Sequence, residues 1–436
     1  MNKIVTSVGL LALGASALHA AESSTLNNMQ DSKAWSVQAT LRGFYDDNVT
    51  TVPSGSEIES AGFEVAPSIR FGMPGEQTSF NVGYGFRAMF YDKNLGGRSG
   101  KSDYTHTFDA DFAHAFSPRL DVSLNESFVI GQEPDVIGDR AGKQRIDGDN
   151  IRNFAGIDFN IAVTDLLGFG IGYNNSFYDY DDEGAVFAGT AVAAASNSGL
   201  LDRMEHSVRI DSNWKLSPTT VGVIGYTYSQ VGYTGDEAIA GNTVIPAGTL
   251  GGVVMSDFRD SQGHTIYLGA QHVFSPALSG YANVGGQYYT YINDPADEAQ
   301  WSPYVRGGLT YALQATTSFD IGIDYSRTAA NEAGSAGTQF VRDTETATVY
   351  ATLKHEIISK LIGSVNGAYS DAKYNGGGAT IDGAHQLYYR LGLDLSYEFA
   401  RNISGHIGYN YDKIDSQLQG RDYDRNRVYA GVTAGF

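Results

Sequence analysis

Strict alternation of apolar and polar residues is the feature of this sequence that most constrains its fold. Between Phe80 and Phe90, for example, apolar side chains occupy every second position, with polar residues or glycine at most positions between them. Successive side chains of an extended strand point to opposite faces, so this period of two indicates strands with one apolar and one polar face. The pattern recurs from Trp35 to the end of the sequence and predicts an all-β chain.

The alternation predicts about eighteen strands of ten or more residues. The fit is weakest at 219–231 and 260–274, which leaves sixteen strands as an alternative. The expected spans are 35–46, 62–73, 78–91, 104–116, 119–130, 150–163, 166–180, 201–216, 219–231, 260–274, 277–291, 301–313, 317–327, 343–355, 360–373, 385–399, 403–412 and 425–436.

The connections between these strands alternate in length. Every second one is tight, as at Pro74-Gly75-Glu76 and Ser117-Pro118-Arg119, and those between are longer and polar, as in Gly131–Asp149. An aromatic or leucine followed by Ser-Pro recurs at Phe116, Leu216 and Phe274, and we interpret it as a turn motif. Short turns on one rim and long loops on the other are typical of an outer-membrane barrel.

Strand length and aromatic placement favour a transmembrane antiparallel β-barrel over a soluble sandwich. Strands of ten or more residues, tilted by about 45°, match the thickness of the hydrocarbon layer. Aromatic residues gather near the expected strand ends, which predicts two girdles. Examples are Phe71 and Phe274 before short turns, and Tyr104, Tyr180 and Tyr291 beside long loops. Closure of the sheet would pair every backbone group, as lipid requires.

The first residues are predicted to lie outside the fold. Residues 1–20 read as a secretory signal peptide, with Lys3, an apolar stretch and small residues before the expected cleavage after Ala20. We expect residues 21–34 to form a short periplasmic segment and residues 35–436 to form the barrel.

Composition excludes several function classes. The 436 residues carry a net charge of −20, which disfavours nucleic acid as a partner because nucleic-acid binding depends on neutralising phosphates. The absence of cysteine removes disulfide and thiolate metal sites, and no cofactor is predicted. No GxSxG or HExxH motif occurs, so we predict that the chain is not an enzyme; a catalytic group assembled from neighbouring strands is the remaining alternative.

Two segments resemble known outer-membrane sequences. The last residues alternate and end in Phe436, with Val432 on the same face, which resembles the C-terminal signal by which bacterial barrels are recognised for assembly. The segments Phe44–Val49 and Phe63–Ile69 resemble the opening of the putative β-barrel porin 2 family. The resemblance implies a barrel in the outer membrane of a Gram-negative bacterium, and some family members are associated with exopolysaccharide export. The assembly signal implies the barrel-assembly machinery as a partner.

Parity assigns charged residues to the inner face of the barrel. The two signs nearly cancel there, which predicts weak ion selectivity, and pairing across strands to stiffen the wall is the alternative role. The candidates for lining the lumen are Arg42, Arg70, Arg87, Asp109, Asp111, Arg152, Asp158, Arg209, Asp211, Arg306, Asp324, Arg390 and Asp394.

Most of the acidic excess falls in the long loops, for example at Asp181, Asp236 and Asp294. Such a rim would attract cations or hold divalent ions that bridge surface lipids, or it is simply solvated charge. Two long loops contain apolar stretches, at 185–195 and 243–255. These stretches would narrow the mouth, form an adhesive surface, or pack against each other.

We therefore predict a porin-like channel for passive diffusion of small hydrophilic solutes through a water-filled lumen. The alternative is a non-channel barrel that serves as an adhesin, as a structural protein or in exopolysaccharide export. The expected partners are outer-membrane lipid, the assembly machinery and small solutes, and a homo-oligomer is left open.

Overall fold

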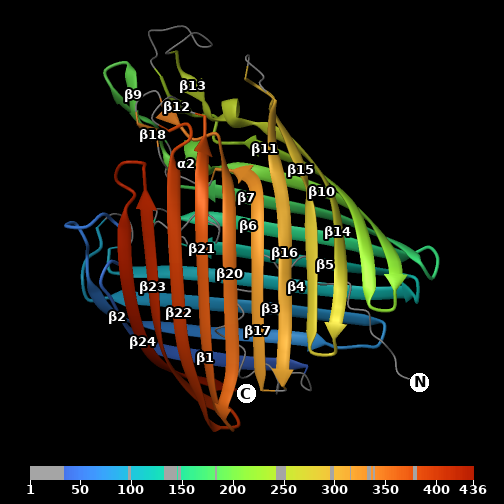
Figure 1. Cartoon of the computed structure of the whole chain (residues 1–436). Helices are drawn as coiled ribbons and strands as arrows, with labels where there is room; N and C mark the ends of the chain where they lie inside the picture. Colours follow the sequence, from blue (N-terminus) through green and yellow to red (C-terminus); the bar gives the residue numbers. More distant parts are fainter. Residues whose placement is uncertain are drawn as a thin grey trace.

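A single sheet closed on itself forms most of the described structure (Figure 1). The computed structural model describes residues 34–96, 100–131, 145, 149–181, 184–241, 252–294, 299–314, 316–330, 335–336, 339–376 and 381–436. The predicted signal peptide, most of the segment 21–34 and the acidic positions 133, 135, 139, 147, 182, 183, 297 and 298 lie outside this part. No helix within the described ranges is long and apolar enough to cross a membrane.

Eighteen antiparallel strands make the barrel wall, each paired with its neighbours in chain order. All eighteen predicted strands are confirmed, and the sixteen-strand alternative is wrong, because the weakly patterned segments form β11 and β14. The wall strands are β1 (Trp35–Asp46), β2 (Ser60–Met73), β3 (Thr78–Tyr91), β4 (Ser102–Ser117), β5 (Leu120–Gly131), β6 (Asn150–Ala162), β7 (Leu167–Tyr180), β10 (Arg203–Ser217), β11 (Thr220–Tyr233), β14 (Ser261–Ser275), β15 (Leu278–Tyr291), β16 (Gln300–Gln314), β17 (Thr317–Ala329), β20 (Asp343–Ile358), β21 (Leu361–Asn375), β22 (His385–Ala400), β23 (Ile403–Ser416) and β24 (Tyr423–Gly435).

The seam between the first and last strands closes the barrel. Strand β24 pairs with β1 from Gln38 opposite Gly435 to Asp46 opposite Arg427. Val37 and Phe436 exchange backbone hydrogen bonds of 3.1 and 2.8 Å beyond that ladder. No strand of the wall therefore has an unpaired edge, which satisfies the backbone groups without water.

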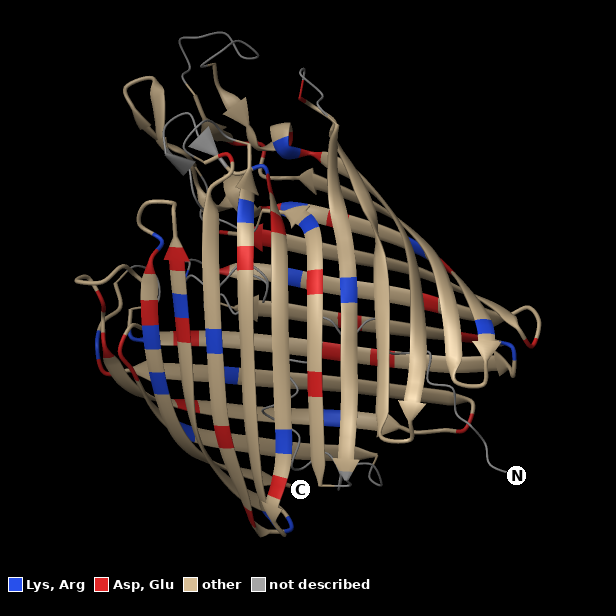
Figure 2. Ribbon diagram, viewed as in Figure 1, with Lys and Arg blue, Asp and Glu red and all other residues tan. Residues whose placement is uncertain are grey.

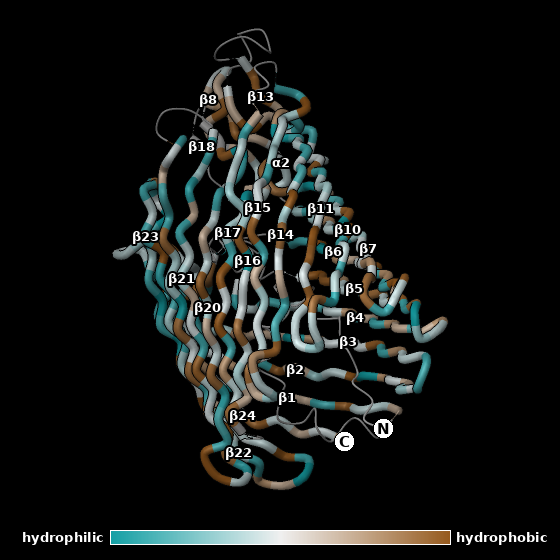
Figure 3. Tube along the Cα trace, turned by 45° about the vertical axis from the view of Figure 1, so that its right-hand side comes forward, coloured by the Kyte–Doolittle hydropathy of each residue, from teal (hydrophilic) through white to brown (hydrophobic). Residues whose placement is uncertain are grey.

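Hydrophobic and hydrophilic residues alternate along the wall strands (Figure 3), and in an extended strand this alternation gives an apolar outer face and a polar inner face. Large apolar side chains on the outer face are exposed, such as Leu41 at 59% and Ile266 at 63%. Their sequence neighbours Arg42 and Tyr267 point inward. Acidic and basic residues are interspersed over the wall in Figure 2. In a soluble protein the exposed apolar face would be a liability, whereas in a membrane it contacts lipid.

The Ser-Pro repeat forms a specific turn. The Ser275 hydroxyl accepts hydrogen bonds from the backbone N–H groups of Ala277 (3.3 Å) and Leu278 (3.1 Å), and Ser117 and Ser217 accept similar bonds two residues ahead. The strand register shifts at each of these serines. The hydroxyl thus satisfies turn donors while proline stops the ladder, which explains the motif as turn chemistry.

The long connections carry short elements that pack together above one side of the barrel (Figure 1). Leu200, Leu201, Ile239 and Ala240 form one buried cluster, and Val192, which is 1% exposed, donates a backbone hydrogen bond of 2.9 Å to Gly241. Ala195 of the first predicted apolar stretch and Val254 of the second pack against the cluster around Ile239, whereas Val186 and Phe187 are exposed. Residues 243–251 of the second stretch lie outside the described part. These elements are β8 (Val186–Ala188), β9 (Ala191–Ala194), α2 (Asn197–Leu201), β12 (Ala238–Ala240), β13 (Val254–Met255), η3 (Ser256–Arg259), β18 (Ser335–Ala336) and β19 (Gln339–Phe340).

Arg259 stabilises the packing of these short elements, which we call the loop assembly. Its guanidinium donates to the carbonyl oxygens of Gly199 (2.9 Å) and Leu200 (2.8 Å) at the end of α2 and lies 3.8 Å from the ring centre of Tyr233. The side chain is 1% exposed. A cation at a helix C-terminus is favourable because the free carbonyls there carry partial negative charge.

Asp202 makes the stability of the loop assembly depend on pH. Burial raises the pKa of this carboxyl to about 6, although it accepts hydrogen bonds from Ser198 (2.6 Å) and from the Tyr180 backbone (2.8 Å). Since the unfolded value is about 3.9, the stabilising contribution is complete below about pH 4 and is lost as the pH rises through about 6.

We expect the hydrogen-exchange protection factor of the Tyr180 amide, corrected for intrinsic rate, to be higher at pH 5 than at pH 7.5. The variant Asp202→Asn should remove this difference, because it has no titrating group there. Asp181→Asn, at an exposed acidic position nearby, is the matched control and should retain it. An unchanged pH response in Asp202→Asn would contradict the assignment.

Candidate functional site

The inner wall of the barrel is where the predicted charged residues gather. The alternation within each strand places all thirteen candidates on the face opposite the exposed apolar residues. Five of them join two belts of hydrogen bonds and ion pairs that cross several strands, and two, Arg70 and Asp111, remain exposed on the inner face.

One belt runs from β6 to β14. The Arg209 guanidinium lies 2.7 Å from Asp158 on β6 and 3.4 Å from Asp211 on its own strand. Asp211 in turn accepts a hydrogen bond from the hydroxyl of Tyr267 on β14. The belt therefore spans five neighbouring strands. Its side chains come from β6, β10 and β14, and they cross over β7 and β11.

Glycines on the intervening strands make this crossing sterically possible. A Cβ atom at Gly172 on β7 would lie 2.4 Å from the Asp158 carboxylate, and one at Gly225 on β11 would lie 2.1 Å from the Tyr267 ring. Tyr267 is directly opposite Gly225 in register and covers its backbone. Placing an aromatic ring over a glycine on the next strand also restores the side-chain packing that the glycine lacks.

A second belt crosses the closing seam from β22 to β2. The Tyr429 hydroxyl donates to Asp394 at 3.2 Å, and the Arg42 guanidinium lies 4.7 Å from the Tyr429 ring centre. Arg42 also donates to His406 at 3.2 Å and lies 3.8 Å from Glu64 on β2. Because β1 and β24 are far apart in sequence, this belt adds side-chain contacts to the only seam that closes the barrel.

The remaining candidates are distributed around the same wall. Arg306 and Asp324 are opposite in register and lie 3.7 Å apart. Arg152 donates to Asn150 at 2.9 Å, Asp109 accepts from Ser127 at 2.8 Å, and Arg390 is opposite Asp412 in register. Arg87 faces inward from β3 and is half-buried. Pairing across strands, the alternative predicted for these charges, accounts for the majority of them.

Arg70 and Asp111 differ from the rest of the set. Both side chains are exposed on the inner face, on β2 and β4 respectively. Among the described residues neither makes a hydrogen bond or an ion pair, although their charges are close enough to interact. A charge that remains exposed to the lumen can act on passing ions, whereas a paired charge is largely neutralised.

Near the mouth, Arg145 reaches the inner wall from the connection between β5 and β6. Its guanidinium donates two hydrogen bonds of 2.7 Å to Asp103 on β4 and lies 5.8 Å from the Tyr91 ring centre. Its backbone N–H donates to the Thr51 hydroxyl at 2.5 Å. The connection therefore approaches the wall from inside at this residue and also contacts the loop between β1 and β2.

The inward tyrosines are the part of the site that the sequence reasoning missed. Aromatic residues were expected in two outer girdles, yet Tyr180 and Tyr291, both assigned there, are each 3% exposed and point inward. The signal that could have found inward aromatics is their parity, which they share with charged residues. Tyr267 alternates with Ile266 and Leu268, and Tyr429 shares parity with Arg427.

Within the described ranges, no group of three or more His, Asp or Glu side chains could hold a metal ion. Some of the acidic loop positions named from the sequence lie within the described part. One of them, Asp294, forms an ion pair with Arg342 at 2.7 Å. Of the predicted assembly residues, Val432 lies on the outer face of β24 and is 48% exposed, and Phe436, directly after the end of β24, is 65% exposed.

The sequence profile of one family matches residues 36–436, and that family is described as putative beta-barrel porin 2. The chain belongs to this family. The match covers the whole described barrel, so the resemblance drawn from two short segments is confirmed. No protein with a curated description matches this porin-family chain.

Several solved outer-membrane barrels are similar to this porin-family chain in shape. A ferric enterobactin receptor mutant from Pseudomonas aeruginosa has 9% identity and a TM-score of 0.46, over 92% of this chain and 80% of that one. OccAB4 from Acinetobacter baumannii has 10% identity and a TM-score of 0.43, over 93% and 100% of the two chains. OpdK from Pseudomonas aeruginosa has 12% identity and a TM-score of 0.43, over 92% and 99%.

The seam belt gives a prediction about stability. Replacing Arg42 by Met leaves Glu64, which is 5% exposed, without its cation, so the free energy of unfolding should fall by about 3 kcal/mol. Urea titrations of the liposome-inserted barrel, followed by tryptophan fluorescence, measure this change.

The double variant Arg42→Met with Glu64→Gln should recover most of the loss, because no buried charge is then left alone. Arg70→Met, which removes an arginine without a close partner from the neighbouring strand, is the matched control and should change the unfolding free energy little. Equal losses in the Arg42 and Arg70 variants would contradict a stabilising role for the seam belt.

Proposed function

We propose that this barrel is a porin that lets small hydrophilic solutes diffuse across the outer membrane through a water-filled lumen. The observation that carries the proposal is the closed wall of eighteen strands with a charged inner face and an apolar outer face. Eighteen strands spaced by about 4.8 Å and tilted by about 40° give a backbone cylinder roughly 35 Å across. Inward side chains cannot fill a cylinder of this width, and a barrel of this size leaves an aqueous channel.

The chemistry of the inner wall supports passive diffusion. Arginine–carboxylate belts hold the wall rigid and leave little net charge on it, so an ion meets no strong barrier of either sign. Membership in a porin family supports the same function. OpdK, a barrel of similar shape, has been solved with vanillate, but the distant likeness transfers no solute to this chain.

Conduction through the lumen predicts opposite effects of two matched variants. In planar bilayers under a salt gradient, wild type should show stepwise conductance with a reversal potential close to zero, displaced slightly towards cations by the acidic loops. Arg70→Gln should move the reversal potential further towards cation selectivity, and Asp111→Asn should move it towards anion selectivity.

The control is Arg119→Gln, which removes the same charge from a short turn, where Arg119 is exposed beside Asp165. It should leave the reversal potential close to the wild-type value. Absence of stepwise conductance from folded protein would overturn the proposal. Identical reversal potentials for Arg70→Gln, Asp111→Asn and wild type would show that ions do not pass these residues.

A second candidate function is a non-channel barrel that displays its loops as an adhesin or takes part in exopolysaccharide export. The compact packing of the loop assembly around Val192, Ile239 and Arg259 supports it, because diffusion alone does not require ordered loops. Folded protein that never conducts in bilayers, yet binds cells or polysaccharide through these loops, would favour this candidate.

A further inference from the structure

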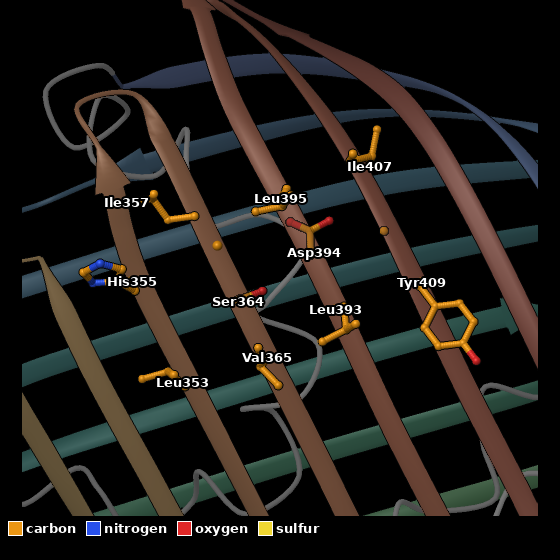
Figure 4. A pocket seen from close by; sticks show the side chains of 12 residues that line it. Leu353, His355, Ile357, Ser364, Val365, Leu393, Asp394, Leu395, Ile407 and Tyr409 are labelled. Carbon is orange, nitrogen blue, oxygen red and sulfur yellow. The ribbon is translucent and has the colours of Figure 1, made fainter.

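A groove in the outer face of the barrel lies on β20, β21, β22 and β23, near the rim of short turns. It measures about 540 Å³ and is lined chiefly by apolar side chains (Figure 4). Those that define it are Leu353, Ile357, Val365, Leu393, Leu395 and Ile407. We call it the β20–β23 groove.

The hollow exists because a glycine interrupts the row of large outer side chains. A Cβ atom at Gly363 would lie 3.1 Å from Ile357 and 3.3 Å from Leu395, so any larger side chain there would occupy the groove. The leucines and isoleucines around it are exposed: Leu353, Leu395, Ile357 and Ile407 range from 40% to 56%. Within the hydrocarbon layer such a groove is filled by an apolar chain and not by water.

His355 lies at the edge of the groove and faces outward (Figure 4). The other outward polar group of the lining is the Tyr409 hydroxyl, which donates to Asn426 at 2.7 Å. Its Nδ1 atom is 2.7 Å from the hydroxyl of Thr317 on β17, opposite it in register. With Nδ1 engaged, Nε2 is the ring nitrogen left for a ligand. An imidazole N–H at this position can donate a hydrogen bond to a phosphate oxygen.

Two cations flank the same end of the groove. Lys360 and Arg401 are exposed in the short turns after β20 and β22. The carbonyl oxygen of Lys360 accepts a 2.8 Å hydrogen bond from the Glu398 backbone, which places the Lys360 turn beside the end of β22. The carboxylates nearby, Glu356 and Glu398, have the parity of the inner face, so the outer side of this rim is basic.

We propose that the β20–β23 groove binds an anionic glycerophospholipid of the inner leaflet. An acyl chain lies in the groove against Gly363, and the phosphate contacts His355, Lys360 and Arg401 at the rim. The joint presence of a lipid-facing hollow and a basic rim argues for this ligand, because a phospholipid carries its apolar chain and its phosphate in the same arrangement.

Two similar histidine–threonine contacts elsewhere on this rim provide an internal comparison. His114 contacts Thr78 at 2.7 Å and His272 contacts Thr220 at 2.8 Å, again with Nδ1 engaged. Each of these histidines packs edge-on against the phenylalanine two residues later in the sequence, with ring centres 4.5 Å apart. The residue two positions after His355 is Ile357 instead. A histidine at the rim is thus a recurring feature, and the groove and basic turns distinguish the proposed site.

Native mass spectrometry of the full folded chain in detergent, with phosphatidylglycerol and phosphatidylethanolamine at equal concentration, tests the proposal. Wild type should retain one phosphatidylglycerol molecule in preference to phosphatidylethanolamine. Neutralising the rim with Lys360→Gln and Arg401→Gln should weaken phosphatidylglycerol binding about fivefold for each cation removed. Gly363→Leu, which fills the groove, should abolish the retained molecule of either lipid.

Arg119→Gln and His272→Ala, which change a cation and a histidine on the same rim away from the groove, should bind as wild type does. Heat-dependent mobility on gels verifies that each variant is folded, and Leu395→Trp fills the groove from the opposite wall if Gly363→Leu fails to fold. Equal retention of the two lipids by wild type, or full retention in a folded groove-filling variant, would overturn the proposal.

Discussion

The hydrogen bonds between β1 and β24 are the interaction on which the rest of this structure depends. A sheet of eighteen strands left open would expose two rows of unpaired backbone groups to lipid, which cannot solvate them. The seam joins residues from opposite ends of the sequence; the Thr40 and Thr433 hydroxyls, for example, lie 2.8 Å apart. Closure also separates the inner face of the sheet from its outer face.

The inner wall shows how such a wide barrel is kept rigid without a packed core. Belts of arginine, carboxylate and tyrosine cross several strands, and glycines on the strands between give them room, as at Gly172 beneath Asp158 and Arg209. The same pairing neutralises much of the charge that a solute would meet. The stiff wall and the weak ion selectivity that we propose therefore have one physical origin, and the exposed residues Arg70 and Asp111 are the exception.

The two faces of the wall meet different solvents, and each accounts for a proposed property. The inner face is polar, which suits the proposed diffusion of hydrophilic solutes. The outer face is apolar and suits contact with lipid. The β20–β23 groove and its basic rim interrupt this otherwise apolar face. At the other rim, Arg259 holds the loop assembly, in which Leu200, Leu201, Ile239 and Ala240 are buried together.

The sequence by itself determined the strands, their order and the face on which each side chain lies. A period of two is a local property, and short turns force consecutive strands to pair, so all eighteen strands and the parity of Arg42, Asp158 or Asp394 could be predicted. The weak segments 219–231 and 260–274 were uncertain because tyrosine, glycine and histidine blur the difference between the faces.

Only the tertiary structure decided which inward residues meet. Parity places Arg209 and Asp158 on one face but says nothing of register across two neighbouring strands, and it cannot show that Tyr429 bridges Asp394 to Arg42 across the seam. The inward tyrosines were missed because an amphipathic ring suits either face. The groove beside His355 was equally hidden, since a hollow depends on the relative heights of side chains on four strands, which are fixed by the stagger of the closed barrel.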